Sequence, residues 1–507
     1  MTTYSYLHVG SHRDLEGRDR TVYRLFEILP GILSWATLLG VVFFSWVWPV
    51  GVAVFIILFD VYWLIKTFYL SLHLRANWKR LKNNLKTDWG ERMENLKWQH
   101  LRQMVILPAY KEPSSIVFES LDAILKSKWP KDRMIVIVAL EERAGEHAKN
   151  LEKEIVEKYA NSFGSFLITF HPTGLEGETP GKGSNVSWAA RLAKEKIIDA
   201  DNIPYENVLV SSFDVDTRVY PQYFFCLAYH FLTAEYPHRS SYQPVPIYNN
   251  NIWSAPALSR VVATSGTFWQ MMQQERPERL TTFSSHSMSF KMLVDVGFWQ
   301  RNMVSEDSRI FWNAFLLYDS DYRVVPMSYP VSLDANVGAN LWQTIKQVYR
   351  QQRRWTWGVE NLPYLLFGFY KNKKITFRRK LYFIATQVEG FWSLATNPIL
   401  IFILGWLPLV LGGQDFNALL LSYNLPRLTR TLMTLAMLGL IWSAIISTSL
   451  LPSRPPYLRK TAWTWHVLQW LLIPITIMFF GAIPGLDAQT RLMLGKRLDF
   501  WVTPKRR

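Results

Sequence analysis

The strongest constraint in this 507-residue sequence is an uncharged run, because no Asp, Glu, Lys or Arg occurs from Gly31 to Phe59. An α-helix needs about 20 apolar residues to cross the hydrocarbon core of a bilayer. The run and its continuation to Leu70 are therefore long enough for two transmembrane helices, with Trp48 and Pro49 marking the turn between them. This segment predicts an integral membrane protein.

Apolar segments return later in the chain, at residues 381–413, 432–451 and 463–485. The intervening residues have the composition of a soluble domain, with short β-branched runs that alternate with helical patterns. We therefore expect an α/β domain inserted between transmembrane α-helices. The predicted division is a cytoplasmic N-terminal segment (1–24), two transmembrane helices (25–70), the inserted cytoplasmic domain (71–380), C-terminal transmembrane or interfacial helices (381–485) and a basic tail (486–507).

Basic residues cluster beside the apolar segments, and the formal net charge is +16. Since Lys and Arg favour the cytoplasmic side of membrane helices, we expect the inserted domain on the cytoplasmic face of the plasma (inner) membrane. Three simple crossings after the domain would leave the basic tail outside. One late segment is therefore expected to be interfacial or re-entrant, first of all the one that contains Glu389. Asp60, alone in the second helix, is either functional or the partner of a residue in another helix.

Composition argues against two further classes of protein. A nucleic-acid binder would explain the positive charge but not the apolar segments, since 49% of the residues are hydrophobic. The single cysteine, Cys226, excludes an intramolecular disulfide and a Cys-rich metal site. We expect a lipid bilayer as a partner, and no nucleic acid.

Four apolar runs in the inserted domain predict parallel strands: QMVILPAY (103–110), RMIVIVAL (133–140), SFLITF (165–170) and NVLVSSFD (207–214). Ligands of such sheets bind beyond the carboxyl ends of the strands. Candidate functional residues are therefore the polar ones that follow each run, in Ala109–Pro113, Glu141–Glu142, His171–Asn185 and Asp214–Asp216.

The sequence FDVDT (213–217) carries two of these candidates. Side chains two apart in extended backbone point to one side, so Asp214 and Asp216 can face one cavity at a strand end. Two carboxylates with no nearby His or Cys suit Mg²⁺ or Mn²⁺ that also binds a diphosphate. The alternative is a turn in which each Asp accepts hydrogen bonds from backbone N–H groups.

The sequence TPGKGSN (179–185) leads into a helix expected to start near Ser184. Gly181 and Gly183 allow a tight turn around Lys182, and a lysine beside a helix N terminus suits an anionic phosphate. A Gly-rich loop with a solvated lysine is the alternative.

Glu306 and Asp307 open an apolar-periodic helix in MVSEDSRIFW. Acidic residues in a first helical turn are favoured by the helix dipole, which is the structural interpretation. The functional interpretation is a general base that takes the proton of an attacking alcohol.

The sequence YRQQRRWTWG (349–358) lies in a helix predicted from Leu341, within an interfacial segment 341–370. Gln351, Arg354 and Trp355 can line one side of a turn, with a guanidinium for diphosphate and an indole for the apolar face of a sugar. An amphipathic helix at the membrane surface is the alternative.

Taken in order, LPAYKE, GKGSN, FDVDT, SED and QQRRW resemble the successive motifs of membrane-embedded, processive family 2 glycosyltransferases, the group of cellulose, chitin and hyaluronan synthases. The resemblance covers about Met104 to Trp355 and the flanking apolar segments. It implies a GT-A type nucleotide-sugar domain and inverting hexosyl transfer (EC 2.4) with Mg²⁺ or Mn²⁺.

The resemblance also implies roles for single residues. Asp214 and Asp216 would face the metal and the donor diphosphate, with Asp216 the better ligand, and Asp307 would be the base, beside Glu306. Gln351, Arg354 and Trp355 would contact diphosphate and acceptor. The donor would lie near Ala109, Tyr110, Glu112 and Lys182.

One departure from the family pattern concerns the nucleotide. An aspartate pair usually follows the second strand, whereas this chain has Glu141 and Glu142, whose carboxylates reach about one methylene further. Either Glu141 or Glu142 is expected to take over the contact to the base, with Glu141 named as the donor-binding residue, a UDP-sugar favoured and a GDP-sugar possible.

These features predict a polysaccharide synthase, and they leave open whether synthesis is coupled to translocation of the product. Two alternatives stay open: a glycosyltransferase that adds one sugar to a lipid, and a non-catalytic transporter or scaffold. In TTFSSHSMSF (281–290), a strand after a loop near the acceptor is expected, and His286 is either structural or a contact of sugar hydroxyls.

Overall fold

The inserted domain is built on one mixed sheet in the computed structural model, which describes residues 5–456, 458–459 and 461–498. The sheet order is β3-β2-β1-β4-β7-β6-β8-β5. The strands β3, β2, β1 and β4 are parallel to one another, whereas β7 is antiparallel to β4 and β6. Their bounds are β1 Arg102–Pro108, β2 Met134–Glu141, β3 Ser165–His171, β4 Val208–Ser212, β5 Arg218–Val219, β6 Ser240–Ile247, β7 His286–Ser289 and β8 Arg323–Ser332.

Helices cover both faces of this sheet, which explains why its central strands are apolar on both sides. One face packs on α4 (Ser114–Leu125), α5 (Glu146–Tyr159) and α7 (Tyr223–Thr233). The other face packs on α6 (Lys182–Ala193), α9 (Phe290–Val296) and α10 (Glu306–Leu317). In β1, for example, Val105 and Leu107 face the first layer, whereas Met104 and Ile106 face the second. All four predicted strands, the predicted strand after the loop and the helix at Glu306 are present.

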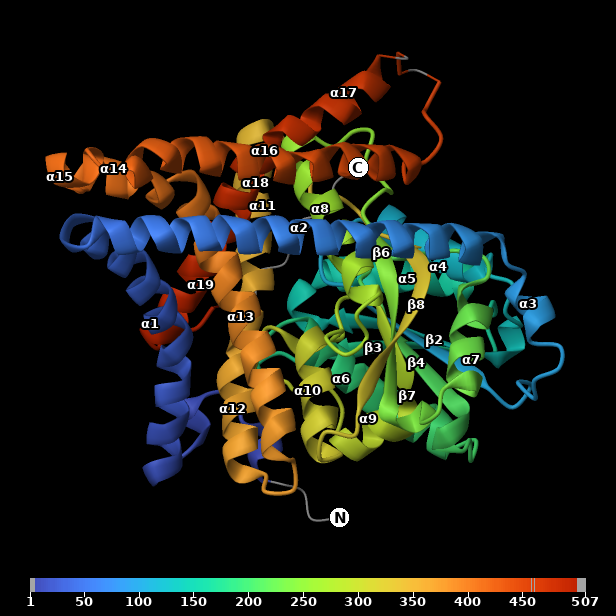
Figure 1. Cartoon of the computed structure of the whole chain (residues 1–507). Helices are drawn as coiled ribbons and strands as arrows, with labels where there is room; N and C mark the ends of the chain where they lie inside the picture. The colour runs from blue at the N-terminus through green and yellow to red at the C-terminus, as the bar shows by residue number, and fades with distance from the viewer. Residues whose placement is uncertain (1–4, 457, 460, 499–507) are drawn as a thin grey trace.

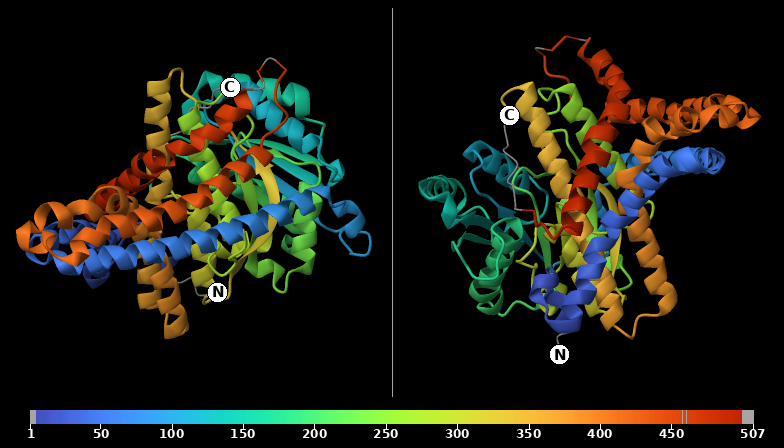
Figure 2. Two further views of the ribbon diagram at one scale, coloured as in Figure 1. Left: turned by 45° about the horizontal axis from the view of Figure 1, so that its top comes forward. Right: turned by 90° about the vertical axis from the view of Figure 1, so that its left-hand side faces the viewer.

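Long apolar helices flank this domain in the sequence and extend away from the sheet (Figure 1, Figure 2). Two precede it, α1 (Gly17–Val47) and α2 (Pro49–Lys86), with α3 (Trp89–Arg92) after them. After the domain come α13 (Phe377–Phe402), α14 (Leu407–Leu411), α15 (Gly413–Asn417), α16 (Leu420–Ser449), α17 (Ala462–Leu468), α18 (Ile473–Ile477) and α19 (Ile483–Met493). Among the described residues, four helical segments are long and apolar enough to cross a membrane: α1, α2, α16 and the run Ala462–Met493 that contains α17 to α19. A bent pair, α13 with the segment Leu404–Leu411, forms a fifth span if the pair is counted as one.

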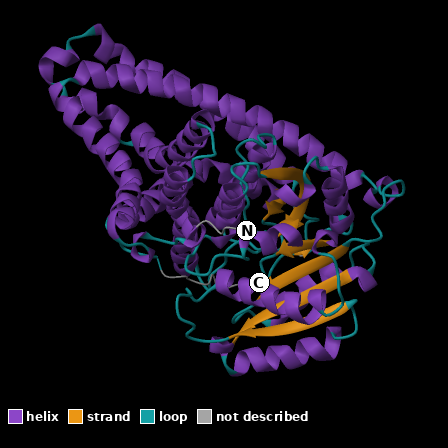
Figure 3. Ribbon diagram, turned by 90° about the horizontal axis from the view of Figure 1, so that it is seen from below, coloured by secondary structure: helices purple, strands orange, loops and turns teal. Residues whose placement is uncertain are grey.

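The expected α/β domain between apolar helices is therefore confirmed. Figure 3 shows the sheet at one end of the molecule and the long helices converging at the other. α2 and α16 pack side by side along the top of the view in Figure 1. The buried Asp60 of α2 lies beside Thr429 of α16, which agrees with a structural partner in another helix.

The bent pair is the segment that contains Glu389, since α13 and α14 meet at 50°. Glu389 forms an ion pair with Lys66 of α2 and lies 3.9 Å from Arg279 of the inserted domain. A carboxylate in an apolar helix is thus neutralised by two cations. This bend fits a broken span or a re-entrant segment, as expected for this part of the chain.

Two boundaries differ from the expectation. α2 continues past residue 70 as far as Lys86, so the inserted domain begins on the same helix that carries the apolar span. The single helix expected for 341–370 is divided into α11 (Leu341–Thr356), the 3-10 helix η8 (Trp357–Glu360) and α12 (Asn361–Lys371). Nearly all of α12 is buried, because it packs against α1, α10 and α13.

Candidate active site

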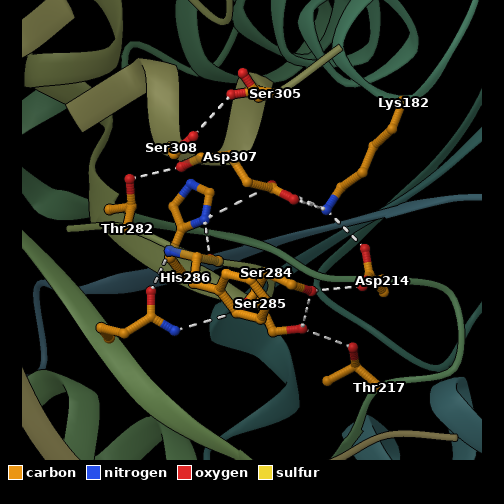
Figure 4. A network of polar contacts seen from close by, with 12 residues as sticks. Lys182, Asp214, Thr217, Thr282, Ser284, Ser285, His286, Ser305, Asp307 and Ser308 are labelled. Carbon is orange, nitrogen blue, oxygen red and sulfur yellow. Dashed lines mark hydrogen bonds and ion pairs between the residues drawn. The ribbon is translucent and has the colours of Figure 1, made fainter. Parts of the chain in front are cut away.

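Three charged side chains from different elements meet beyond the carboxyl end of β4 (Figure 4). Lys182 is the first residue of α6, Asp214 follows β4, and Asp307 lies in the first turn of α10. The Lys182 ammonium donates to Asp214 Oδ1 at 2.7 Å and to both carboxylate oxygens of Asp307 at 2.9 Å. Three motifs that are far apart in the sequence are therefore in direct contact.

The two carboxylates are the accessible members of this cluster. The Lys182 side chain is 10% exposed, compared with 33% for Asp214 and 23% for Asp307. Burial lowers the pKa of the Lys182 ammonium, but the charges of Asp214 and Asp307 outweigh burial and raise this pKa above its ordinary value. Lys182 is therefore a permanent cation between two acids.

Glu306 lies in the protein interior beside this cluster. Its residue is 4% exposed, and burial, followed by the charge of Asp307, raises the pKa of its carboxyl. A Cβ atom at Gly183 would lie 2.9 Å from Glu306 Cβ, so a side chain at this position would force α6 and α10 apart. Gly183 thus allows the close approach by which Lys182 reaches Asp307. Of the two acids predicted to be catalytic, Asp307 is the one that forms an ion pair with Lys182.

Asp214 and Asp216 differ in their exposure. β4 ends at Ser212, and the residues that follow form a turn in which the Thr217 N–H donates to the Asp214 carbonyl at 2.9 Å, so the alternation of an extended strand no longer applies. Asp216 is fully buried, and its Oδ2 accepts the Asp334 N–H at 2.9 Å. The exposure of the two acids therefore favours Asp214 as the ligand-facing residue, the reverse of the sequence expectation.

A loop before β7 borders the cluster. Ser284 Oγ donates to Asp214 Oδ2, and Thr282 Oγ1 donates to the Asp307 carbonyl at 2.6 Å. Ser285 adopts a left-handed backbone with a φ of 63°, and its hydroxyl lies 2.9 Å from that of Thr217. These contacts fix the loop across both acids, and sequence analysis singled out none of the three residues.

His286 begins β7 behind this loop (Figure 4). Its Nδ1 lies 2.8 Å from the Phe283 carbonyl and 3.8 Å from Asp307 Oδ1. Burial lowers the pKa of its imidazole, although the nearby Asp307 opposes this. His286 is fully buried, which favours the structural interpretation over a contact with sugar.

α11 brings the Arg- and Trp-rich motif to the same region. The Trp355 ring lies 5.9 Å from the Tyr248 ring and 5.7 Å from the Phe283 ring, measured between centroids. Arg354 is close enough to Glu306 to oppose the rise of its pKa. Gln351 is only 8% exposed. Trp355 therefore belongs to an aromatic cluster next to the acids, which includes two residues that the sequence analysis missed.

The predicted donor-binding residues lie at the ends of β1 and β2. Ala109 is buried, and Glu112 accepts the backbone N–H of Tyr110 at 2.7 Å. Glu141 is paired with Arg143, whose guanidinium lies 4.3 Å from the centre of the Tyr110 ring. A nucleobase contact by Glu141 would therefore also involve Arg143, which was not predicted.

The acids fit a divalent cation only in part. The described residues hold no group of three or more His, Cys, Asp or Glu side chains that could bind a metal ion by themselves. Yet Asp214 and Asp307 already accommodate a positive charge, that of Lys182. Since Mg²⁺ is commonly held by one or two carboxylates together with substrate phosphates and water, this donor set suits a cation that arrives with a diphosphate.

Comparison with known proteins gives distant structural likeness only. No family model matches the chain, and no curated protein matches it in sequence. The mannosyltransferase PcManGT from Pyrobaculum calidifontis, in complex with GDP-Man and Mn²⁺, is 14% identical, with a TM-score of 0.41 over 77% of this chain and 98% of that one. TarS 1–349 from S. aureus is 12% identical, with a TM-score of 0.35 over 74% and 91%. At these scores, neither a substrate nor a residue role is transferred to this chain.

Proposed function

We propose that this chain is an inverting, metal-dependent family 2 glycosyltransferase that extends a polysaccharide from a nucleotide-sugar donor at the cytoplasmic face of the plasma membrane. The observation that carries the proposal is the contact of Lys182 with both Asp214 and Asp307 beyond the end of β4. Ligands of open α/β sheets bind at this edge.

Asp307 is the proposed general base. Its carboxylate is partly exposed, as proton transfer from an acceptor hydroxyl requires. The hydroxyl oxygen forms a bond to C1 of the donor sugar on the face opposite the diphosphate, the C1–O bond to the diphosphate breaks, and the hydroxyl proton goes to Asp307. One displacement of this kind inverts the configuration at C1.

Lys182 and Arg354 are the proposed partners of the leaving diphosphate, since both are cations next to the acids. Asp214 would hold Mg²⁺ or Mn²⁺, with Asp216 fixing the turn behind it. Such a cation neutralises charge on the departing diphosphate. When the donor phosphates draw Lys182 away, Asp307 becomes free to accept a proton.

Trp355 is the proposed platform for the acceptor sugar. Its ring lies beside Tyr248 and Phe283, and sugar rings present apolar C–H faces to aromatic rings. α11, which carries Trp355, packs against α19 and against α8 (Ala257–Gln274), so the acceptor end of the site adjoins the apolar helices. A growing glycan and a lipid are both compatible with this position, and product size separates them.

The test is turnover by the purified full-length chain in nanodiscs. Radiolabelled UDP- and GDP-sugars would be supplied with Mn²⁺ or Mg²⁺, and Asp307→Asn would be run beside the wild type. A large, glycosidase-sensitive product that the variant lacks supports the synthase. A single-sugar product that extracts into organic solvent supports transfer to lipid, and neither turnover nor nucleotide binding supports the non-catalytic alternative.

A further inference from the structure

Glu360 is a buried carboxylate that contacts the turn just before the acids of α10. It belongs to η8 and is 7% exposed. Its Oε1 accepts the Ser305 hydroxyl at 2.6 Å, the Ser305 N–H at 3.0 Å and the Val304 N–H at 3.4 Å. One oxygen atom thus satisfies three donors at the N terminus of α10, where Ser305 provides no side-chain cap of its own.

The next residue, Asn361, holds the same helix from the other side of the acids. Its amide Nδ2 donates to Ser308 Oγ at 2.8 Å, and its Oδ1 accepts the Nε of the fully buried Arg309 at 2.6 Å. Ser305 and Ser308 flank Glu306 and Asp307 in the sequence. The dipeptide Glu360–Asn361 therefore forms hydrogen bonds at both ends of the turn that contains Glu306 and Asp307.

The dipeptide Glu360–Asn361 is connected to α11, the helix that carries Trp355. η8 follows α11 directly, so only a few residues separate Trp355 from Glu360. The link between them is rigid, because Trp357 is 2% exposed and Thr356 donates to the Pro484 carbonyl at 3.1 Å. A displacement of α11 would therefore also displace Glu360 and the turn that holds Asp307.

We propose that Glu360 is a positioning residue. By accepting hydrogen bonds from Val304 and Ser305, it sets the direction of the Asp307 carboxylate relative to the diphosphate and acceptor motif of α11. This inference rests on the proposed function. The requirement is geometric, since a carboxylate must lie within hydrogen-bond reach of the hydroxyl that it deprotonates. A misplacement of about 1 Å can lower turnover by about 100-fold.

Three substitutions separate geometry from charge. Glu360→Gln keeps an oxygen at Oε1 that can accept all three donors, so it should retain turnover within about threefold. Glu360→Asp keeps the charge but withdraws the oxygen by one methylene, so it should lower kcat by about 30- to 100-fold. Glu360→Ala should fall at least as far. In all three, the KM for donor and the affinity for the free nucleotide diphosphate should stay near the wild-type values.

The matched control is Glu275→Asp. The Glu275 side chain is 11% exposed, and its carboxylate accepts hydrogen bonds from Asn77 at 3.0 Å and Arg80 at 3.1 Å but forms no hydrogen bond or ion pair with α10 or η8 among the described residues. It should change the melting temperature and leave kcat unchanged. If Glu360→Ala does not fold, the comparison of Gln with Asp still decides the question.

The inference is overturned if Glu360→Asp has wild-type kcat, if Glu360→Gln is as poor as Glu360→Ala, or if the loss appears in donor KM alone. A wild-type protein that neither turns over nor binds any nucleotide sugar overturns the proposed function instead. The two failures are therefore distinct.

Discussion

Lys182 Nζ lies 2.9 Å from each carboxylate oxygen of Asp307, so the candidate phosphate ligand and the candidate base neutralise each other. The same ammonium also contacts Asp214. A donor diphosphate would compete with both acids for this cation. In the proposed mechanism, the position of Lys182 would therefore control both donor binding and the availability of the base.

Lys182→Gln should weaken binding of the nucleotide diphosphate by about 10- to 100-fold, because a hydrogen bond between charged groups contributes about 1.5–3 kcal/mol. Calorimetric titration of the purified chain with UDP and GDP measures this change. Lys182→Arg keeps the charge and serves as the comparison. Equal affinity in wild type and Lys182→Gln would remove Lys182 from the phosphate site.

The two acids of FDVDT should respond differently to substitution. Asp216→Ala leaves the buried Asp334 N–H without its acceptor, so the free energy of unfolding should fall by about 1–3 kcal/mol. Asp214→Asn should leave the melting temperature nearly unchanged and weaken the dependence of nucleotide binding on Mn²⁺. Thermal unfolding and titration at several Mn²⁺ concentrations separate the effects. The reverse pattern would make Asp216 the metal-facing residue.

Stability should fall as pH rises through the range in which Glu306 titrates. Burial, and then the charge of Asp307, raise the pKa of the Glu306 carboxyl in the folded protein. The folded state therefore binds this proton more tightly than the unfolded state, and its contribution to stability is complete at a pH below the unfolded pKa. It is lost as pH increases toward the folded pKa. Glu306→Gln cannot lose a proton, so its melting temperature should decline less over this range than that of the wild type.

Strands whose local sequence is a continuous apolar run could be predicted, whereas strands that depend on contacts elsewhere in the fold could not. The strands β1 and β2 are continuous apolar runs covered on both faces, so their sequences alone predict them. β6 is also fully buried, but it contains Pro244 and Pro246, and proline cannot donate to a sheet ladder. The ladder of β6 with β8 shifts register between Gln243 and Val245, which accommodates Pro244. Only the folded structure shows this compensation.

The residues of the site likewise divide into those that belong to sequence motifs and those that only the fold brings together. Lys182, Asp214 and Asp307 belong to recognisable motifs, and the structure brings all three together. Tyr248 was missed because it directly follows β6, and the two prolines of β6 prevent this strand from being predicted from its sequence. Glu360 was missed for another reason, since its role depends on the break between α11 and α12 that the helical pattern of 341–370 does not reveal.

Trp355 tests the acceptor side of the site. Its indole packs against Tyr248 and Phe283, and its removal would leave a gap where a sugar ring is expected to stack. Trp355→Ala should lower transfer to the acceptor by at least about tenfold, as expected when an aromatic contact of about 0.5–1.5 kcal/mol is lost together with the packing that supports it. Trp355→Phe keeps an aromatic face and should retain most of the activity. Donor affinity, measured by titration, should remain within about threefold in both variants. If donor affinity falls as steeply as transfer does, Trp355 supports the diphosphate and not the acceptor.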